Sequence, residues 1–146
     1  MSTATRTLYV AEPPAQFLLL PPLVVDCSTL AGLVFNESWH EQALRRIEGR
    51  SLNAPYLLEI EMTSVALKKH RRGFPDLASS GMQHYATMDI KLHPVKPDGV
   101  LILAVRYQLS AYDATYLWLA TELKAPLATF DEKLATAAQA HLATLS

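Results

Sequence analysis

The fold is decided by a short stretch of sequence, Leu23-Val24-Val25-Asp26. Three consecutive apolar residues, two of them β-branched, are typical of a strand that is buried on both faces, as the strands of parallel sheets are. Parallel neighbours need crossover connections, and these are usually helical. The stretch therefore predicts an α/β protein with a central, mostly parallel sheet flanked by helices, and it places Asp26 at the carboxyl end of a strand.

The rest of the chain supports this class, because helix-like and strand-like segments alternate along it. Ser38 and Glu41 have the S-x-x-E spacing of a capping box. Several prolines stand where a first helical turn tolerates them, ahead of apolar residues at helical spacing. We predict helices that begin near Ser38, Pro55, Pro75, Pro97, Ser110 and Asp131, and strands over residues 23–25, 90–95 and 126–130.

The start of the chain has a different character. Four prolines fall within the first 22 residues, and no hydrophobic period is sustained there. We predict an extended N-terminal arm over residues 1–21 and one domain over residues 22–146. Half of the 146 residues are apolar, which is enough for a core without disulfides or structural metal. The single cysteine fits a reducing, cytoplasmic location, and no apolar run approaches the roughly 20 residues of a membrane span.

Two of the predicted strands end in a carboxylate. Asp26 follows the first strand and Asp131 follows the last, and ligands gather where the carboxyl ends of parallel strands meet. Asp113 lies in a first helical turn, and Glu61 lies about two turns into a helix, on a face that can turn inward. Four converging carboxylates repel one another unless a proton or a cation is present. The sequence therefore predicts an all-oxygen site for Mg²⁺ or Mn²⁺ that can activate water.

Each of these carboxylates also has a purely local explanation. Asp26 can cap the turn after its strand, Asp113 can belong to a capping box, and Asp131 can be a helix N-cap. Glu61 can be a surface residue beside Glu59. Position in the sequence leaves both interpretations open at every one of the four residues.

The charge of the chain is unusual for a protein that binds a polyanion. The formal net charge is -1, whereas nucleic-acid-binding domains are usually basic. If four carboxylates are committed to metal, the remainder is net positive. Its cations are equally explained as phosphate contacts or as solvated helix ends. They form two clusters, Lys68, Lys69, Arg71 and Arg72, and Arg45, Arg46 and Arg50.

Other residues with chemistry of their own are assigned to structure. Trp39 and Trp118 lie in helical apolar patterns, which favours core or dimer contacts over base stacking. The helix that carries Tyr116, Trp118 and Leu119 is predicted to offer apolar surface for a homodimer. A place on the helix surface is favoured over catalysis for the scattered histidines, His40, His70, His84, His93 and His141.

Four segments follow one another in a specific order and spacing. They are Val24-Val25-Asp26-Cys27-Ser28; Ala54-Pro55 with Glu61; Leu109-Ser110-Ala111-Tyr112-Asp113-Ala114 with Tyr116, Leu117, Leu119 and Ala120; and Ala125-Pro126-Leu127-Ala128-Thr129-Phe130-Asp131 with Lys133-Leu134. Together they resemble the PIN-domain nucleases, and in particular the VapC-type toxins of bacterial toxin–antitoxin pairs. The resemblance covers about residues 22–142, and residues 110–120 are its most specific part.

This resemblance implies a PIN-like three-layer fold and a Mg²⁺- or Mn²⁺-dependent endoribonuclease. The residues that match the family's catalytic and metal-binding acids are Asp26, Glu61, Asp113 and Asp131. RNA is the implied substrate. A homodimer and a cognate antitoxin protein, whose basic side chains compete with metal or substrate, are the implied partners.

The resemblance also bears on residues around the acids. Ser28 and Thr129 match hydroxyl positions that can hold a carboxylate or a water by hydrogen bonds. Two features depart from the family pattern: the arm of residues 1–21, and Ser64, which stands where asparagine is common. Two alternatives stay open, namely a binding module that keeps the fold without turnover, and a nuclease that acts on DNA or in RNA processing outside any toxin–antitoxin pair.

Overall fold

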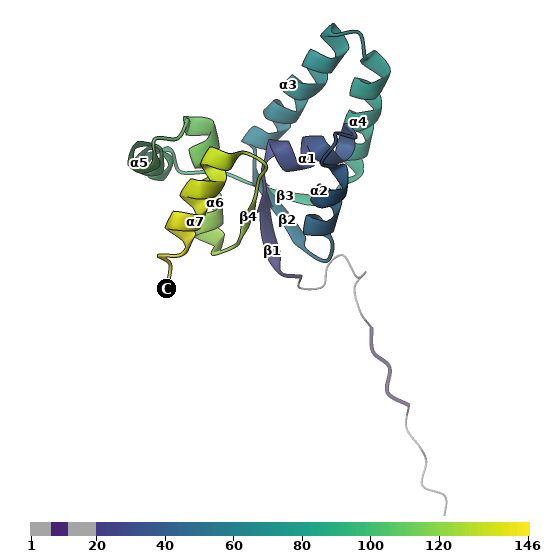
Figure 1. The fold of residues 1–146 in the computed structure, drawn as a ribbon. Helices are drawn as coiled ribbons and strands as arrows, with labels where there is room; N and C mark the ends of the chain where they lie inside the picture. Colours follow the sequence, from purple (N-terminus) through teal and green to yellow (C-terminus); the bar gives the residue numbers. More distant parts are fainter. Residues whose placement is uncertain (1–6, 12–19) are drawn as a thin grey trace, which may run out of the picture.

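The computed structural model describes residues 7–11 and 20–146. In that part of the chain, one four-stranded parallel sheet has seven helices around it (Figure 1). The strand order is β3-β2-β1-β4. The strands are β1 Pro22–Val25, β2 Ser51–Pro55, β3 Ile90–His93 and β4 Leu127–Ala128. The helices are α1 Cys27–Val34, α2 His40–Ile47, α3 Leu57–Arg71, α4 Pro75–Thr87, α5 Pro97–Tyr107, α6 Ala111–Leu123 and α7 Glu132–Leu142. The predicted class and the parallel sheet are confirmed.

The helices form a layer on each side of the sheet. Figure 1 shows α1 and α2 on one side and α5, α6 and α7 on the other, with α3 and α4 projecting as an antiparallel pair. Because all four strands are parallel, their carboxyl ends lie at one edge of the sheet. The loops that follow β1 and β4 therefore meet there.

Strand β1 is the centre of the core, as its sequence predicts. Leu23, Val24 and Val25 are fully buried. Val24 lies opposite Asn53 of β2 and opposite Leu127 of β4. Burial on both faces explains why the strand reads as a continuous apolar run rather than as an alternating one.

The capping and proline signals in the second half of the chain are confirmed. Helices α4 and α5 begin at Pro75 and Pro97. Ser110 caps α6, its side-chain oxygen accepting from the backbone N–H of Asp113. Asp131 caps α7 in the same way, accepting from the N–H of Leu134. Local signals suffice here because each concerns the few residues that begin a helix.

The helix predicted to begin near Ser38 begins at His40, and the capping box is wrong. Trp39 is the N-cap residue of α2, and no side chain caps this helix. The pattern also misses α1. Thr29, Gly32 and Val34 are poor helix formers, so this helix depends on burial, and six of its eight residues are buried.

The helix predicted to begin at Pro55 is also displaced, because Pro55 ends strand β2 and α3 begins at Leu57. Strand β2 has no β-branched residue, so its sequence gives no strand signal. The other predicted strands are confirmed with shorter bounds. Strand β3 ends at His93, and β4 is only Leu127–Ala128.

The predicted division into an arm over residues 1–21 and a domain over residues 22–146 stays a prediction, since residues 1–6 and 12–19 lie outside the described part. Residues 7–11 and 20–21 have no regular secondary structure. Among the described helices, none combines the length and the apolar composition that crossing a bilayer requires.

Candidate active site

Asp26 is the most buried carboxylate at the edge where the strands end, with 5% of its surface exposed. It follows β1 and is the N-cap of α1. Its Oδ1 accepts hydrogen bonds from the hydroxyl of Ser28 at 2.7 Å, and from the N–H and hydroxyl of Thr29, both at 3.1 Å. Its Oδ2 accepts from the hydroxyl of Thr129 at 2.5 Å. The local explanation, a cap, is correct, but it leaves most of these donors unexplained; together they fix the carboxylate in one orientation.

The hydroxyls of Ser28 and Thr129 also join the two loops that follow β1 and β4. Ser28 Oγ accepts from the N–H of Phe130 at 2.9 Å, and Thr129 Oγ1 accepts from the N–H of Asp131 at 3.0 Å. Asp131 is thereby held beside Asp26. The expectation that both residues emerge at one edge of the sheet is met.

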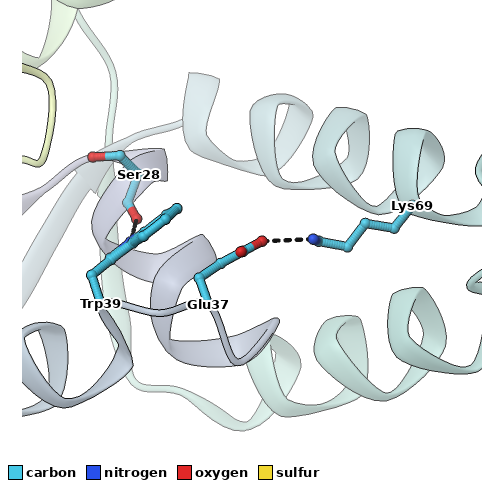
Figure 2. A network of polar contacts seen from close by, with 4 residues as sticks. All are labelled: Ser28, Glu37, Trp39 and Lys69. Carbon is cyan, nitrogen blue, oxygen red and sulfur yellow. Dashed lines mark hydrogen bonds and ion pairs between the residues drawn. The ribbon is translucent and has the colours of Figure 1, made fainter.

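A side chain from the segment between α1 and α2 holds the backbone of Ser28 in place (Figure 2). The indole Nε1 of Trp39 donates to the carbonyl of Ser28 at 3.0 Å. Any side chain at Gly32 would collide with that indole, so glycine is required for this approach. In the same loop, Glu37 accepts from Lys69 of α3 at 2.6 Å. One cation of the predicted basic cluster is therefore engaged in holding this loop to α3.

Glu61 enters the site from the second turn of α3 and is half-buried. Its Oε1 accepts from the hydroxyl of Tyr116 at 2.5 Å, across 55 residues of sequence. Burial raises the pKa of Glu61; the hydrogen bond from Tyr116 lowers it, and the charges of Asp26 and Asp113 raise it. Glu61 is therefore not a surface glutamate like Glu59, because it is half-buried and close enough to two other acids for their charges to affect its pKa.

Asp113 completes the group from the first turn of α6. Burial raises the pKa of Asp113, and the charges of Asp131 and Asp26 raise it further, against smaller opposite effects of Ser110 and Lys133. The four predicted acids thus come from the end of β1, α3, α6 and the start of α7, and the charge of Asp26 acts on both Glu61 and Asp113. Sequence position could suggest this convergence, but it could not establish it.

The chemistry of these groups fits a hard divalent cation. All the donors are carboxylate oxygens, the type that Mg²⁺ and Mn²⁺ prefer. Burial, and after it the charges of neighbouring acids, raise the pKa of Glu61 and of Asp113, and a cation would favour the ionised form of both. Within residues 7–11 and 20–146, however, no three His, Cys, Asp or Glu side chains are placed so that they could hold a metal ion together. The fit is therefore one of charge and donor type.

Cys27, directly after Asp26, is not a nucleophile of this site. Its Sγ donates to Met62 Sδ at 3.7 Å. Burial raises the pKa of Cys27 to about 12, and the charges of Glu61 and Asp26 add to this effect. The side chain therefore stays a neutral thiol and fills space between α1 and α3.

The histidines lie apart from the acids, but the prediction of helix surface is wrong for two of them. His93 is on strand β3, and its Nε2 lies 2.8 Å from Asn53 Oδ1. His141 is buried on α7, where its Nδ1 lies 2.8 Å from the hydroxyl of Tyr107. Burial lowers the pKa of both histidines, so these are neutral structural residues.

Sequence reasoning missed the roles of Tyr116 and Thr29. Tyr116 was assigned to an apolar pattern, and it is indeed buried, but its hydroxyl holds Glu61. A usable signal is its position three residues after Asp113, which places both on one side of α6. The N–H of Thr29 donates to Asp26, and its hydroxyl, with one proton, lies 2.9 Å from the carbonyl of Ala128 and 3.1 Å from Asp26 Oδ1. No local sequence pattern predicts the contact with Ala128, which is 99 residues away in the sequence.

No family model matches the chain. The ribonuclease VapC9 of Mycobacterium tuberculosis is 31% identical to it over 122 residues, which cover 82% of this chain and 93% of that protein.

Two solved structures share the fold. PAE2754 of Pyrobaculum aerophilum has a TM-score of 0.65 at 23% identity and covers 84% of this chain and 93% of its own. VapC20 of Mycobacterium tuberculosis, described as a sarcin-ricin loop cleaving toxin, has a TM-score of 0.59 at 16% identity and covers 79% and 94%. At these identities the likeness concerns the fold alone.

Proposed function

The chain belongs to the PIN-domain VapC family of ribonucleases, and we propose from that premise that it is a divalent-metal-dependent endoribonuclease, the toxin of a toxin–antitoxin pair. One observation in the chain itself carries this proposal. Burial raises the pKa of Glu61 and Asp113, the charge of Asp26 raises both further, and Asp26 is itself fixed by hydroxyl and amide donors. The proposed catalytic and metal-binding residues are Asp26, Glu61, Asp113 and Asp131, supported by Ser28 and Thr129.

The acidic residues would have different roles in such a site. A bound Mg²⁺ or Mn²⁺ would lower the pKa of a water molecule and offset charge on the phosphate oxygens. Asp26 is the stationary member, because four donors hold it. Tyr116 donates to Oε1 of Glu61, and the N–H of Leu134 donates to Oδ1 of Asp131, so Glu61 and Asp131 would be held in place while they help to bind an ion.

Contacts to RNA are proposed for cations that the fold does not use otherwise. Lys69 is paired with Glu37, and Arg50 donates to the carbonyl of Pro22 at 3.1 Å. Lys68 is exposed, and its charge is felt at Cys27, next to the carboxylates. We place Lys68 against a phosphate of the substrate. Such a contact positions the backbone and carries no base preference.

The other elements of the proposal follow from family membership. A cognate antitoxin would restrain the enzyme by presenting basic side chains to the carboxylates, in competition with metal or substrate. A cytoplasmic location and a homodimer belong to the same proposal. The residues of the domain, 22–146, would carry the activity.

Two other functions are compatible with the fold. A binding module without turnover would not need four acids, and all four are present. A nuclease acting on DNA, or in RNA processing outside a toxin–antitoxin pair, would use the same site. A short neighbouring reading frame that encodes a DNA-binding domain with a basic tail would favour the toxin, and its absence would favour these alternatives.

We expect RNA cleavage to require Mg²⁺ or Mn²⁺ and to stop in EDTA. The reason is that the described residues offer no nucleophile and base pair near these carboxylates, whereas an ion held by them would activate water. Cleavage of a labelled RNA is followed after dialysis against EDTA and again after each metal is restored. Undiminished cleavage in EDTA would exclude the metal mechanism.

We expect Tyr116→Phe to weaken Mn²⁺ binding and RNA cleavage about tenfold each, since a hydrogen bond to a charged group contributes about 1.5–3 kcal/mol. Calorimetric titration with Mn²⁺ gives the affinity independently of activity. Tyr107→Phe is the matched control, because it removes a hydroxyl that is hydrogen-bonded to His141 instead of to a carboxylate. If both variants bind Mn²⁺ as the wild type does, Tyr116 is only a core residue.

A further inference from the structure

Trp39 lies between the two loops that carry the acids at the strand ends. Its indole Nε1 donates to the carbonyl of Ser28, two residues after Asp26, at 3.0 Å. Its ring packs against the ring of Phe130, the residue directly before Asp131, with 5.9 Å between the ring centroids and 42° between the planes. This distance is typical of a favourable aromatic pair. One side chain therefore contacts both the loop after β1 and the loop after β4.

The indole is closely held in this position. A Cβ at Gly32 of α1 would lie 2.1 Å from the indole Nε1, so the ring lies directly against the backbone of α1. The carbonyl of Trp39 accepts from the N–H of Ala43 in the first turn of α2, at 3.0 Å. The N–H of Glu37 donates to the carbonyl of Gly32 at 3.1 Å. The ring is thus fixed by α1, and the backbone that carries it is fixed by both helices.

The same segment is attached to α3, the helix that carries Glu61. The carboxylate of Glu37 pairs with Lys69 of α3 at 2.6 Å (Figure 2). Lys69 Nζ also lies 5.6 Å from the centre of the Phe35 ring, at the end of α1. The segment between α1 and α2 therefore contacts three of the four parts of the chain from which the acids come.

The contacts of Trp39 reach the carboxylates through one intermediate residue on each side. Ser28 Oγ donates to Asp26 Oδ1 at 2.7 Å and accepts from the N–H of Phe130 at 2.9 Å. Phe130 is directly followed by Asp131. A shift of the indole would move the backbone of Ser28 and the ring of Phe130, and it would change the spacing of the two carboxylates. Groups that orient metal ligands in this way usually matter about 10- to 100-fold in metal affinity or activity.

We propose that Trp39 is a positioning residue of the metal site, which sets the spacing between Asp26 and Asp131 by holding the two loops against each other. This inference rests on the proposed function, because it requires that these carboxylates share an ion. Trp39 acts through Ser28 and Phe130, so it affects the affinity for the ion and not that for RNA.

The other tryptophan of the chain is a matched control. Trp118 of α6 lies against Gly99 of α5, where an added Cβ would be 2.3 Å from the indole Nε1. Both tryptophans therefore approach a helix glycine in the same way. Trp118 packs against the hydrophobic core, and Tyr116 and Leu119 of the same helix are almost fully buried. These residues therefore offer little of the apolar surface that the sequence predicts for a dimer.

The first test removes the indole donor. Trp39→Phe keeps an aromatic ring but loses the N–H that reaches Ser28. Calorimetric titration with Mn²⁺ should give a dissociation constant raised about tenfold or more. RNA cleavage by this variant should fall at limiting Mn²⁺ and recover as Mn²⁺ is raised, with KM for RNA unchanged. Trp118→Phe makes the same chemical change away from the two loops and should leave the Mn²⁺ dissociation constant unchanged.

The second test displaces the indole without removing it. Gly32→Ala places a methyl group where the indole lies, while alanine itself favours a helix more than glycine does. Mn²⁺ binding should weaken as it does in Trp39→Phe. The double variant should lose little more affinity than either single variant, since both changes disrupt one contact. Gly99→Ala creates the same collision at Trp118 and is the control.

Thermal melts in EDTA separate positioning from general stability. Variants at both tryptophans and both glycines are expected to melt at lower temperatures, but only those at Trp39 and Gly32 should bind Mn²⁺ more weakly. Unchanged Mn²⁺ affinity in folded Trp39→Phe, or an equal loss of affinity in Trp118→Phe, would overturn the inference while the proposed function stands. A wild type that binds no Mn²⁺ would instead refute the proposed metal site, and this inference with it.

Discussion

Replacing Asp113 by asparagine is expected to lower the rate of RNA cleavage by about 10²–10³-fold, the usual cost of removing one group that stabilises charge in a transition state. Asp113 is half-buried, and its charge is felt by Glu61. Asparagine keeps the shape of the side chain and the backbone N–H that Ser110 caps. The substitution should therefore remove a metal-binding oxygen and leave the fold intact. Single-turnover cleavage, with circular dichroism to confirm folding, measures both.

Asp98→Asn is the control for this result. Asp98 also lies in the first turn of a helix, α5, but it is exposed and is not among the charges that raise the pKa of Glu61 or Asp113. Cleavage by this variant should stay within about twofold of the wild type, since surface substitutions of this kind have small effects. Equal losses at both positions would mean that the site has been placed wrongly.

The sequence could predict the elements that depend on neighbouring residues, but not those that depend on contacts between distant parts of the chain. The starts of α4, α5, α6 and α7 were predictable because a proline or a capping side chain acts on the next three residues. Strand β1 was predictable because a strand buried on both faces needs consecutive apolar residues, and three of them follow one another here. Helix α1 and strand β2 were not predictable, because both depend on neighbours contributed by other parts of the chain.

The site divides in the same way. Asp26 and Asp131 were predictable from strand ends, since parallel topology brings such ends to one edge. Their hydroxyl partner Thr129 could only be named from a resemblance. The bond from Tyr116 to Glu61 joins two helices that are 55 residues apart in sequence, and packing alone creates it. Sequence thus suggested the candidate acids, whereas the structure was needed for the groups that orient them.

The crowding of the acids should itself be measurable as stability, without any substrate. Burial, with the nearby charges of Asp26 and Asp113, raises the pKa of Glu61, so the ionised side chain destabilises the metal-free fold. For a carboxyl with a raised pKa, this cost is absent below the unfolded pKa, grows as the pH rises from the unfolded to the folded pKa, and is complete above the folded pKa. Thermal melts are therefore best compared at alkaline pH, where the largest share of Glu61 is ionised.

Under those conditions in EDTA, we expect Glu61→Gln to melt at a higher temperature than the wild type. Glutamine removes the charge and keeps an oxygen that can accept from Tyr116. Adding Mn²⁺ should reverse the order, because an ion at a hundred times its dissociation constant stabilises a protein that binds it only when folded by about 2.7 kcal/mol. The variant, having lost a metal-binding oxygen, should gain much less.

Glu59→Gln provides the comparison that decides between the two interpretations of Glu61. Glu59 lies on the same helix and is exposed, outside the group of acids. Its variant should therefore gain as much stability from Mn²⁺ as the wild type does. If Glu61→Gln behaves like Glu59→Gln, with no reversal between EDTA and Mn²⁺, Glu61 is only a helix residue and the ion is not shared among the four carboxylates. A reversal at Glu61 alone would place that residue among the metal ligands even if the RNA target were never found.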